Sequence, residues 1–240
     1  MLTGFLKKIH FARINIKKPV WNERWGPMRI DREVLQAFLK EVKIESQSPD
    51  DPVVALHIPY PWELVGTGNY AAVFAHPDYP RVVIKLYAPG RPGWEQEIEV
   101  YKKLGETRSF PMMYDYGEGY LVIKRINGIS LFDCARFGIP IPPQVIEDVE
   151  RALKEAREKG LFPHDVHGKN VLMDQGRGYL IDVSDYYKNV PDSKWRDLRK
   201  AYYKIYLPFL KDRGWKIPLW VLNGVRKGYR LYKKARRLFT

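Results

Sequence analysis

A polar loop followed by a short apolar hairpin, within residues 163–182, constrains the fold of this chain more than any other feature. The loop carries Asp165 and, five positions later, Asn170; twelve residues further on, an apolar run ends at Asp182. The apolar residues 171–173 and 179–181 are predicted to form two strands joined by a glycine-containing turn. Such a hairpin would place Asn170 and Asp182 side by side.

Two carboxylates and one amide in this order are the groups that phosphoryl transfer requires. One carboxylate receives or orients the attacking hydroxyl, while an asparagine and a second carboxylate hold magnesium against the nucleotide phosphates. The pattern Asp, Asn, Asp also arises by chance, so the interpretation depends on support from the rest of the chain.

A glycine-containing turn between two predicted strands, in residues 64–74, gives the first support. Gly66 and Gly68 have no Cβ, so the backbone N–H groups around them can approach a phosphate closely. The sequence therefore predicts a phosphate-covering loop at this turn.

A lysine inside an apolar strand gives the second piece of support for this interpretation. Lys85 lies among the β-branched residues of the predicted strand 81–87, where an unpaired charge is costly. Its expected partners are nucleotide phosphates and a glutamate of the following helix. That helix is predicted at residues 94–104, with Gly105 as its C-cap.

The order of these motifs resembles that of the protein-kinase-like superfamily, over roughly residues 60–200. The resemblance implies an α+β, two-lobed fold with an antiparallel β-sheet in the N-lobe, a mainly helical C-lobe, and ATP between them. The expected division is an N-terminal extension with one helix packing on the N-lobe at 1–58, the N-lobe at 59–124, and the C-lobe with a basic C-terminal helix at 125–240.

The resemblance also implies roles for individual residues. Asp165 and Lys85 are the expected catalytic residues, and Asn170 and Asp182 are the expected Mg²⁺ ligands. The adenine is expected to meet the main chain of a hinge near residues 124–126. The residues expected to bind ATP are Gly66, Gly68, Lys85, Glu97, Ile123, Lys124, Arg125 and Ile126.

The choice of glutamate stays open at this point. Glu97 fits the helix pattern of the family best, but its interval from Lys85 is short, so Glu95 and Glu99 remain possible partners. Ala71 replaces the third glycine of the phosphate loop, which is a mild departure from the family pattern.

Further departures fall around the predicted active-site loop. Pro163 stands where the family usually has histidine, and His167 stands where typical Ser/Thr protein kinases have lysine. Asp165-x-His167-x-x-Asn170 is similar to aminoglycoside, choline and other small-molecule kinases and to atypical kinase branches. Lys169 is a candidate to replace the missing lysine in part.

The region after Asp182 is short. Residues 183–193 lead directly into a predicted helix at 194–202, which leaves no room for a long activation segment. Val183 and Ser184 replace the Phe-Gly that usually follows the aspartate. Asp197 either braces the catalytic loop, as the resemblance implies, or is a solvated helix acid.

Two more helices are predicted from apolar periodicity, one at residues 31–42 with Asp31 as its N-cap and one at 142–159 ended by Gly160. The lone cysteine, Cys134, excludes an intrachain disulfide. Residues 1–13 lack a continuous apolar core, so a secretory signal is not expected.

Basic residues exceed acidic ones by 41 to 28, a net charge of +13. The alternatives are an anionic partner, namely RNA, an acidic protein or a membrane surface, or a solvated basic helix docked on the C-lobe. We expect a cytoplasmic protein, with a membrane or ribonucleoprotein surface as an alternative site. The basic helix face comprises Arg226, Arg230, Lys233, Lys234 and Arg237.

The predicted reaction is transfer of the ATP γ-phosphoryl group to a hydroxyl. The favoured acceptor is a protein, which would make this an atypical Ser/Thr protein kinase. The alternative is a small-molecule, sugar or lipid-linked kinase. A pseudokinase or nucleotide-binding interaction module is a third hypothesis, although every expected catalytic position holds a competent residue.

Overall fold

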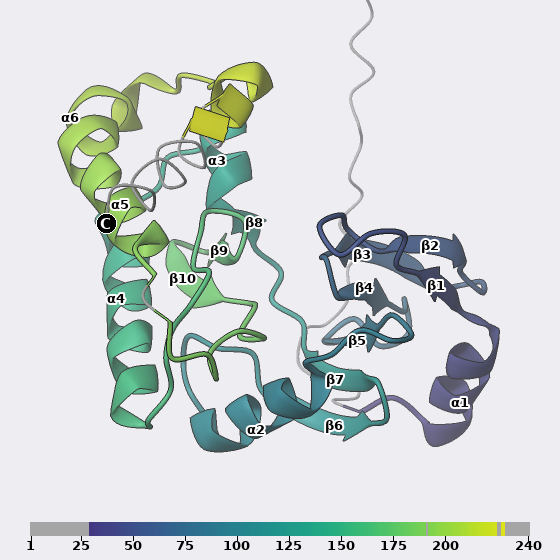
Figure 1. Ribbon diagram of the computed structural model, residues 1–240. Helices are drawn as coiled ribbons and strands as arrows, with labels where there is room; N and C mark the ends of the chain where they lie inside the picture. Colours follow the sequence, from purple (N-terminus) through teal and green to yellow (C-terminus); the bar gives the residue numbers. More distant parts are fainter. Residues whose placement is uncertain (1–28, 191, 225–226, 229–240) are drawn as a thin grey trace, which may run out of the picture.

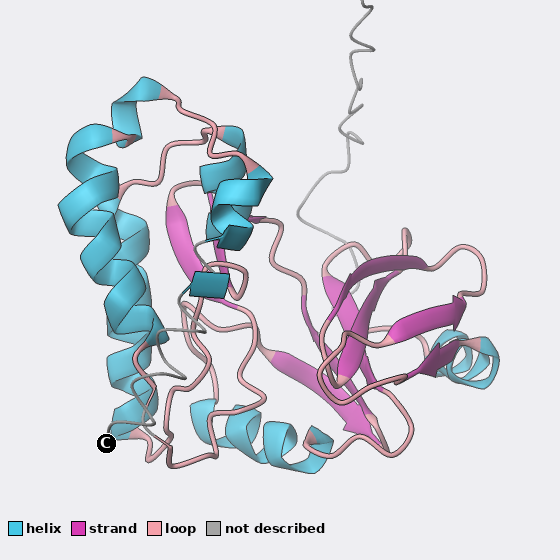
Figure 2. Ribbon diagram, turned by 45° about the horizontal axis from the view of Figure 1, so that its top comes forward, coloured by secondary structure: helices cyan, strands magenta, loops and turns pink. Residues whose placement is uncertain are grey.

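The computed structural model describes residues 29–190, 192–224 and 227–228 of the chain. The described residues form two lobes, linked by the strand-to-loop segment near residues 125–128 (Figure 1). Most strands lie in one lobe and most helices in the other (Figure 2). The predicted two-lobed α+β fold of the kinase-like type is therefore confirmed.

The N-lobe is built on a five-stranded antiparallel sheet with the order β3-β4-β5-β7-β6. These strands are β3 (Glu63–Thr67), β4 (Ala71–Ala75), β5 (Val82–Tyr87), β6 (Met113–Gly117) and β7 (Tyr120–Lys124). The other elements of this lobe are α1 (Arg32–Glu41), β1 (Lys43–Glu45), β2 (Val54–His57) and α2 (Trp94–Leu104).

Side chains of the sheet alternate between two buried faces, as the period of a β-strand requires. Phe74 and Ile84 lie in the cluster that includes α1, whereas Val83 and Leu121 lie in the cluster that includes α2 and the C-lobe. The sheet therefore has helices on both faces and fixes α2 beside the lobe boundary.

Helix α1 packs on the sheet through Phe38, which is 1% exposed and lies 4.1 Å from Trp62 and 5.2 Å from Phe74 between ring centroids. Burial of such a side chain contributes about 1.5–3 kcal/mol. Asp31 takes the predicted N-cap position, but its side chain makes no capping bond, and Oδ2 instead accepts a 2.7 Å hydrogen bond from the Tyr79 hydroxyl.

The C-lobe combines helices with a small antiparallel sheet of order β10-β9-β8. Its strands are β8 (Ile129–Ser130), β9 (Val171–Asp174) and β10 (Arg177–Leu180). Its helices are α3 (Leu131–Phe137), α4 (Pro143–Glu158), α5 (Lys194–Ala201), the π-helix η1 (Tyr202–Tyr206), α6 (Leu207–Phe209) and the 3-10 helix η2 (Lys211–Arg213). Residues 219–224 are also helical.

The short connection after Asp182 is present as predicted, because α5 begins at Lys194. The cations of the predicted basic helix face and residues 1–13 lie outside the described residues, so both interpretations stay predictions. The division of the chain at residues 58 and 124 also stays a prediction. Within the part of the chain that the structure describes, no helix is both long and apolar enough to span a bilayer.

Candidate active site

Lys85 lies at the centre of a buried ion cluster between the lobes. Its Nζ is 2.8 Å from Oε1 of Glu97 on α2 and 3.2 Å from Oδ1 of Asp182, which follows β10. The Tyr87 hydroxyl donates a short hydrogen bond to the other oxygen of Glu97. The structure thus brings together three residues separated by up to 97 positions, and the glutamate that pairs with Lys85 is Glu97.

The ionisation of this cluster follows from its neighbours. Burial disfavours the charge on Lys85, but the carboxylates of Asp182 and Glu97 outweigh it and raise the pKa of Lys85. Burial likewise opposes the charge of Asp182, yet Lys85 and the Ser184 N–H hold the pKa of Asp182 below its usual value. For Glu97, burial dominates and raises the pKa. Because its own pKa is raised, Lys85 remains a cation at this position.

The predicted hairpin is present, with a tighter turn than expected. Strands β9 and β10 pair Val171 with Leu180, and the two-residue turn Gln175–Gly176 has positive φ at both positions, 47° and 75°. This geometry is that of a type I′ hairpin turn. The Ile181 N–H donates to the Asn170 carbonyl at 3.1 Å, so the chain enters Asp182 directly beside Asn170.

A buried aspartate of α4 anchors this hairpin, and the sequence analysis missed it. Asp148, 1% exposed, accepts two hydrogen bonds from the Arg177 guanidinium at 2.7 and 2.9 Å and one from the Gly178 N–H at 3.1 Å. Strand and helix approach so closely that a Cβ on Gly178 would lie 2.5 Å from the Val145 carbonyl oxygen. The position of the expected metal ligands therefore depends on α4.

The side chains of Asp192 and Asn170 hold the backbone of the loop that carries Asp165. Asp165 adopts φ 54°, unusual for a residue with a side chain, and its N–H donates to Oδ2 of Asp192 at 2.7 Å. The Asn170 side-chain amide donates to the Asp165 carbonyl at 3.3 Å. These two bonds fix the Asp165 backbone and leave Oδ1 of Asn170 as the atom available to a metal.

The Asp165 carboxylate has a cationic partner that the sequence analysis did not identify. Lys194, the first residue of α5, donates a short hydrogen bond from Nζ to Oδ1 of Asp165. Nε2 of His167 lies 3.8 Å from the same oxygen, and burial lowers the pKa of His167. Lys169, the predicted replacement lysine, lies over the Phe132 ring at 5.0 Å instead.

The glycine turn joins β3 and β4. A bulge occurs between Leu64 and Gly66, and the Gly68 N–H closes the turn onto the Ala71 carbonyl at 2.8 Å. A Cβ at Gly66 would meet no atom within 4 Å, so the space above this strand is open to a ligand. At the tip of the turn, the Tyr70 ring lies 5.8 Å from Nζ of Lys188.

The predicted hinge lies at the end of β7. Ile123 is buried, while the N–H groups of Lys124 and Arg125 donate to the carbonyls of Met112 and Arg81, each at 2.8 Å. The N–H groups of Lys124 and Arg125 are thus already bonded within the N-lobe. Of the predicted hinge residues, Ile126 is therefore the one whose N–H we expect to bind the adenine base.

Magnesium fits the chemistry of the remaining groups. Mg²⁺ prefers oxygen ligands and is usually held by one or two protein groups together with phosphates and water. Asn170 and Asp182 supply such oxygens beside Lys85. Within the described ranges, no cluster of three or more His, Cys, Asp or Glu side chains offers an alternative metal site.

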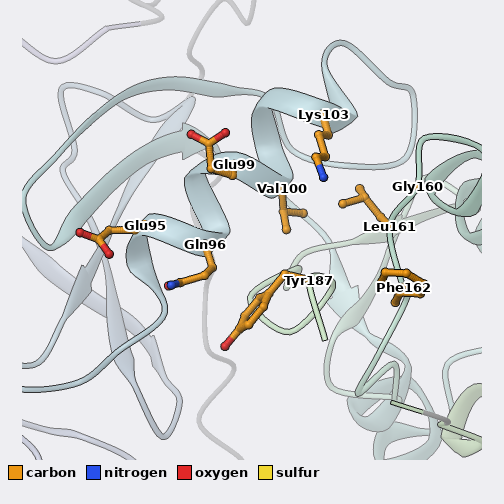
Figure 3. Close-up of a pocket in the computed structure, with 9 residues that line it drawn as sticks. All are labelled: Glu95, Gln96, Glu99, Val100, Lys103, Gly160, Leu161, Phe162 and Tyr187. Atoms are coloured by element: carbon orange, nitrogen blue, oxygen red, sulfur yellow. The ribbon is translucent and has the colours of Figure 1, made fainter. Parts of the chain in front are cut away.

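A hollow of about 240 Å³ lies beside α2, against the chain that leads to the Asp165 loop (Figure 3). Its lining includes Glu95 and Glu99, the alternatives considered for Lys85, so these two glutamates face a different space from Glu97. The lining residues are Glu95, Gln96, Glu99, Val100, Lys103, Gly160, Leu161, Phe162 and Tyr187.

Asp197 lies in the first turn of α5, where it accepts a 2.9 Å hydrogen bond from the Ser193 hydroxyl. The Asp197 N–H in turn donates to the Ser193 carbonyl at 2.9 Å. This pairing orders the start of the helix that carries Lys194. Direct bracing of the loop by Asp197 stays a prediction.

Comparison with known proteins finds similar chains. No family model matches this sequence. A Bacillus subtilis (strain 168) protein named "Putative serine/threonine-protein kinase YrzF" is 32% identical over 146 residues, covering 60% of this chain and 68% of that protein. The solved kinase domain of Mycobacterium tuberculosis PknI aligns with a TM-score of 0.40 and 20% identity. That alignment covers 54% of this chain and 59% of the PknI chain.

Proposed function

Because the chain belongs to the protein-kinase-like superfamily, we propose that it is an ATP-dependent phosphotransferase that moves the γ-phosphoryl group to an alcohol. The observation that carries the proposal is the contact of Lys85 with both Glu97 and Asp182, at 2.8 and 3.2 Å. A lysine fixed as a cation beside a carboxylate of low pKa is suited to a nucleotide phosphate and its metal.

Each residue of the site has a distinct role in this proposal. Glu97 orients Lys85, which binds the α- and β-phosphates through Nζ. Asn170 and Asp182 would hold Mg²⁺, whose charge would offset that of the phosphate oxygens. Gly66 and Gly68 cover the phosphates with backbone, because no Cβ obstructs the approach.

Asp165 orients the acceptor hydroxyl and accepts its proton late in the transfer, since the transition state of phosphoryl transfer is loose. Lys194 contacts Asp165 and lies on the acceptor side of the site. Once the acceptor displaces the Lys194 ammonium from Asp165, the ammonium faces the oxygens of the transferred group. Positioned charge of this kind is a principal source of rate enhancement.

We favour a protein Ser/Thr hydroxyl as the acceptor, in line with the name of the Bacillus subtilis relative. The alternative is a small-molecule, sugar or lipid-linked alcohol, which is favoured by His167 and by the short connection to α5. Incubation with Mg·ATP and a peptide array separates the two: phosphorylated peptides support a protein kinase, and phosphorylation restricted to small alcohols supports the alternative.

The first test is a thermal-shift titration with Mg·ATP. A ligand that binds only the native state raises its stability by about 2.7 kcal/mol at one hundred times its Kd. We expect a magnesium-dependent rise in Tm for the wild type and its loss in Asp182→Ala. Asp174→Ala, at the far end of the same hairpin, is the matched control and should retain the shift. A wild type that shows no shift at millimolar Mg·ATP contradicts the proposal.

A further inference from the structure

Large apolar side chains are exposed on the part of the C-lobe that follows α5. Trp220 is 76% exposed and Trp215 59%. This part forms the end of the C-lobe away from α2 (Figure 1). Exposed apolar side chains that gather in one region mark a candidate contact surface, and the six of this segment all lie within residues 203–220. The group, called here the apical surface, comprises Tyr203, Ile205, Phe209, Trp215, Leu219 and Trp220.

The apical surface is exposed although its segment is firmly docked. The Tyr202 hydroxyl donates to the Ile141 carbonyl at 2.9 Å, the Ile141 N–H donates to the Tyr206 hydroxyl at 2.9 Å, and the two tyrosine rings stack at 5.3 Å. Further on, the Ile217 N–H donates to the Ala135 carbonyl of α3 at 3.0 Å. The segment therefore has an inner face bound to the lobe and an outer face that lacks such a partner among the described residues.

Positive charge is concentrated in this part of the sequence. Residues 198–240 contain thirteen Lys and Arg and one acidic residue, Asp212. Among the described residues here, the cations Lys200, Lys204, Arg213, Lys216 and Lys227 are exposed.

We propose that the apical surface docks on an anionic lipid bilayer. Tryptophan and aliphatic side chains enter the boundary between headgroups and acyl chains, while neighbouring lysines extend to the anionic headgroups. Single-stranded nucleic acid would use the aromatic rings as stacking platforms but would leave Ile205 and Leu219 exposed to water. A bilayer accommodates both kinds of apolar side chain and the charge, so it is the partner that fits best.

The test is sedimentation of the full chain with vesicles, at low and at high salt. The vesicles are phosphatidylglycerol mixed with phosphatidylcholine, or phosphatidylcholine alone. We expect binding to the anionic vesicles only, weakened by salt because exposed charges are screened. A Trp215→Ser/Trp220→Ser double variant and a Lys204→Glu/Lys216→Glu double variant should each lower partitioning at least tenfold.

The matched control is Leu56→Ser/Tyr60→Ser, which removes two apolar side chains of the N-lobe that are 57% and 96% exposed. It should bind vesicles like the wild type, and all variants should keep the Tm of the wild type. The proposal is overturned if the wild type does not sediment with anionic vesicles, if the apical variants bind as well as the control, or if RNA binds this surface and vesicles do not. None of these measurements depends on phosphoryl transfer.

Discussion

Replacing Lys194 by alanine separates a catalytic role from a structural one. The lysine and its partner Asp165 have side chains that are 40% and 37% exposed. An ion pair that is this accessible to water contributes about 0–1 kcal/mol to stability. For a chain of this size, such a loss lowers Tm by about 2–4 °C at most.

The expected effect on rate is much larger. A fixed donor aimed at developing charge contributes about 2.7–4 kcal/mol to the transition state, which is a factor of about 10²–10³ in kcat. We therefore expect Lys194→Ala to lose most of its turnover while remaining folded and retaining Mg·ATP binding, because Lys85 and Asp182 are untouched.

The assay is initial-rate transfer from radiolabelled ATP at saturating Mg·ATP, to an acceptor or to water, combined with the Mg·ATP thermal shift. Lys200→Ala, on the same helix and exposed, is the control for general loss of positive charge. Lys169→Ala tests the rival lysine. The reasoning is refuted if Lys194→Ala turns over within threefold of the wild type, or if Lys169→Ala shows the larger loss.

Three further predictions concern stability. Gly178→Ala should lower Tm sharply, since its Cβ would lie 2.5 Å from the Val145 carbonyl oxygen; an unchanged Tm would refute this close packing. Asp148→Asn should cost about 1.5–3 kcal/mol in urea unfolding at pH 7. Burial opposes the Asp148 charge, but the hydrogen bonds from Arg177, the Gly178 N–H and Gln144 together outweigh it and lower the pKa of Asp148, so the cost should disappear as pH falls below about 3.8. Burial lowers the pKa of His76, so the unfolded state takes up more protons below pH of about 6.5; Tm should fall on acidification, and less in His76→Gln.

Local patterns in the sequence predicted several elements of the backbone. The glycine turn and the β-branched run located β3, β4 and β5, and Gly105 ends α2 with φ 59° at its C-cap, as predicted. The sequence left open which glutamate of α2 pairs with Lys85, and the orientation of the helix in the structure decides it. Of the three candidates on α2, Glu97 is fully buried, whereas Glu95 and Glu99 are exposed. Which glutamate is buried depends on how α2 packs against the sheet. The number of residues between Lys85 and each glutamate does not reveal that packing.

The residues that the sequence analysis missed share one cause. Lys194 meets Asp165 across 29 positions, and Arg177 meets Asp148 across 29 positions. Contacts between separate elements have no periodicity that a single sequence reveals. At Asp31 a local pattern predicted a contact that a distant residue replaces. The sequence assigned the Asp31 carboxylate to a helix cap, but it accepts a hydrogen bond from Tyr79, 48 positions away.

The contact between Tyr70 and Lys188 has a consequence for the time that a nucleotide remains bound. It joins the tip of the glycine turn to the C-lobe segment that follows Asp182. A cation–π contact of about 0.5–1 kcal/mol must be broken each time the turn lifts. If opening precedes escape, this contact alone slows ADP departure roughly two- to fivefold. Loss of the Tyr70 ring should therefore shorten the residence time of ADP.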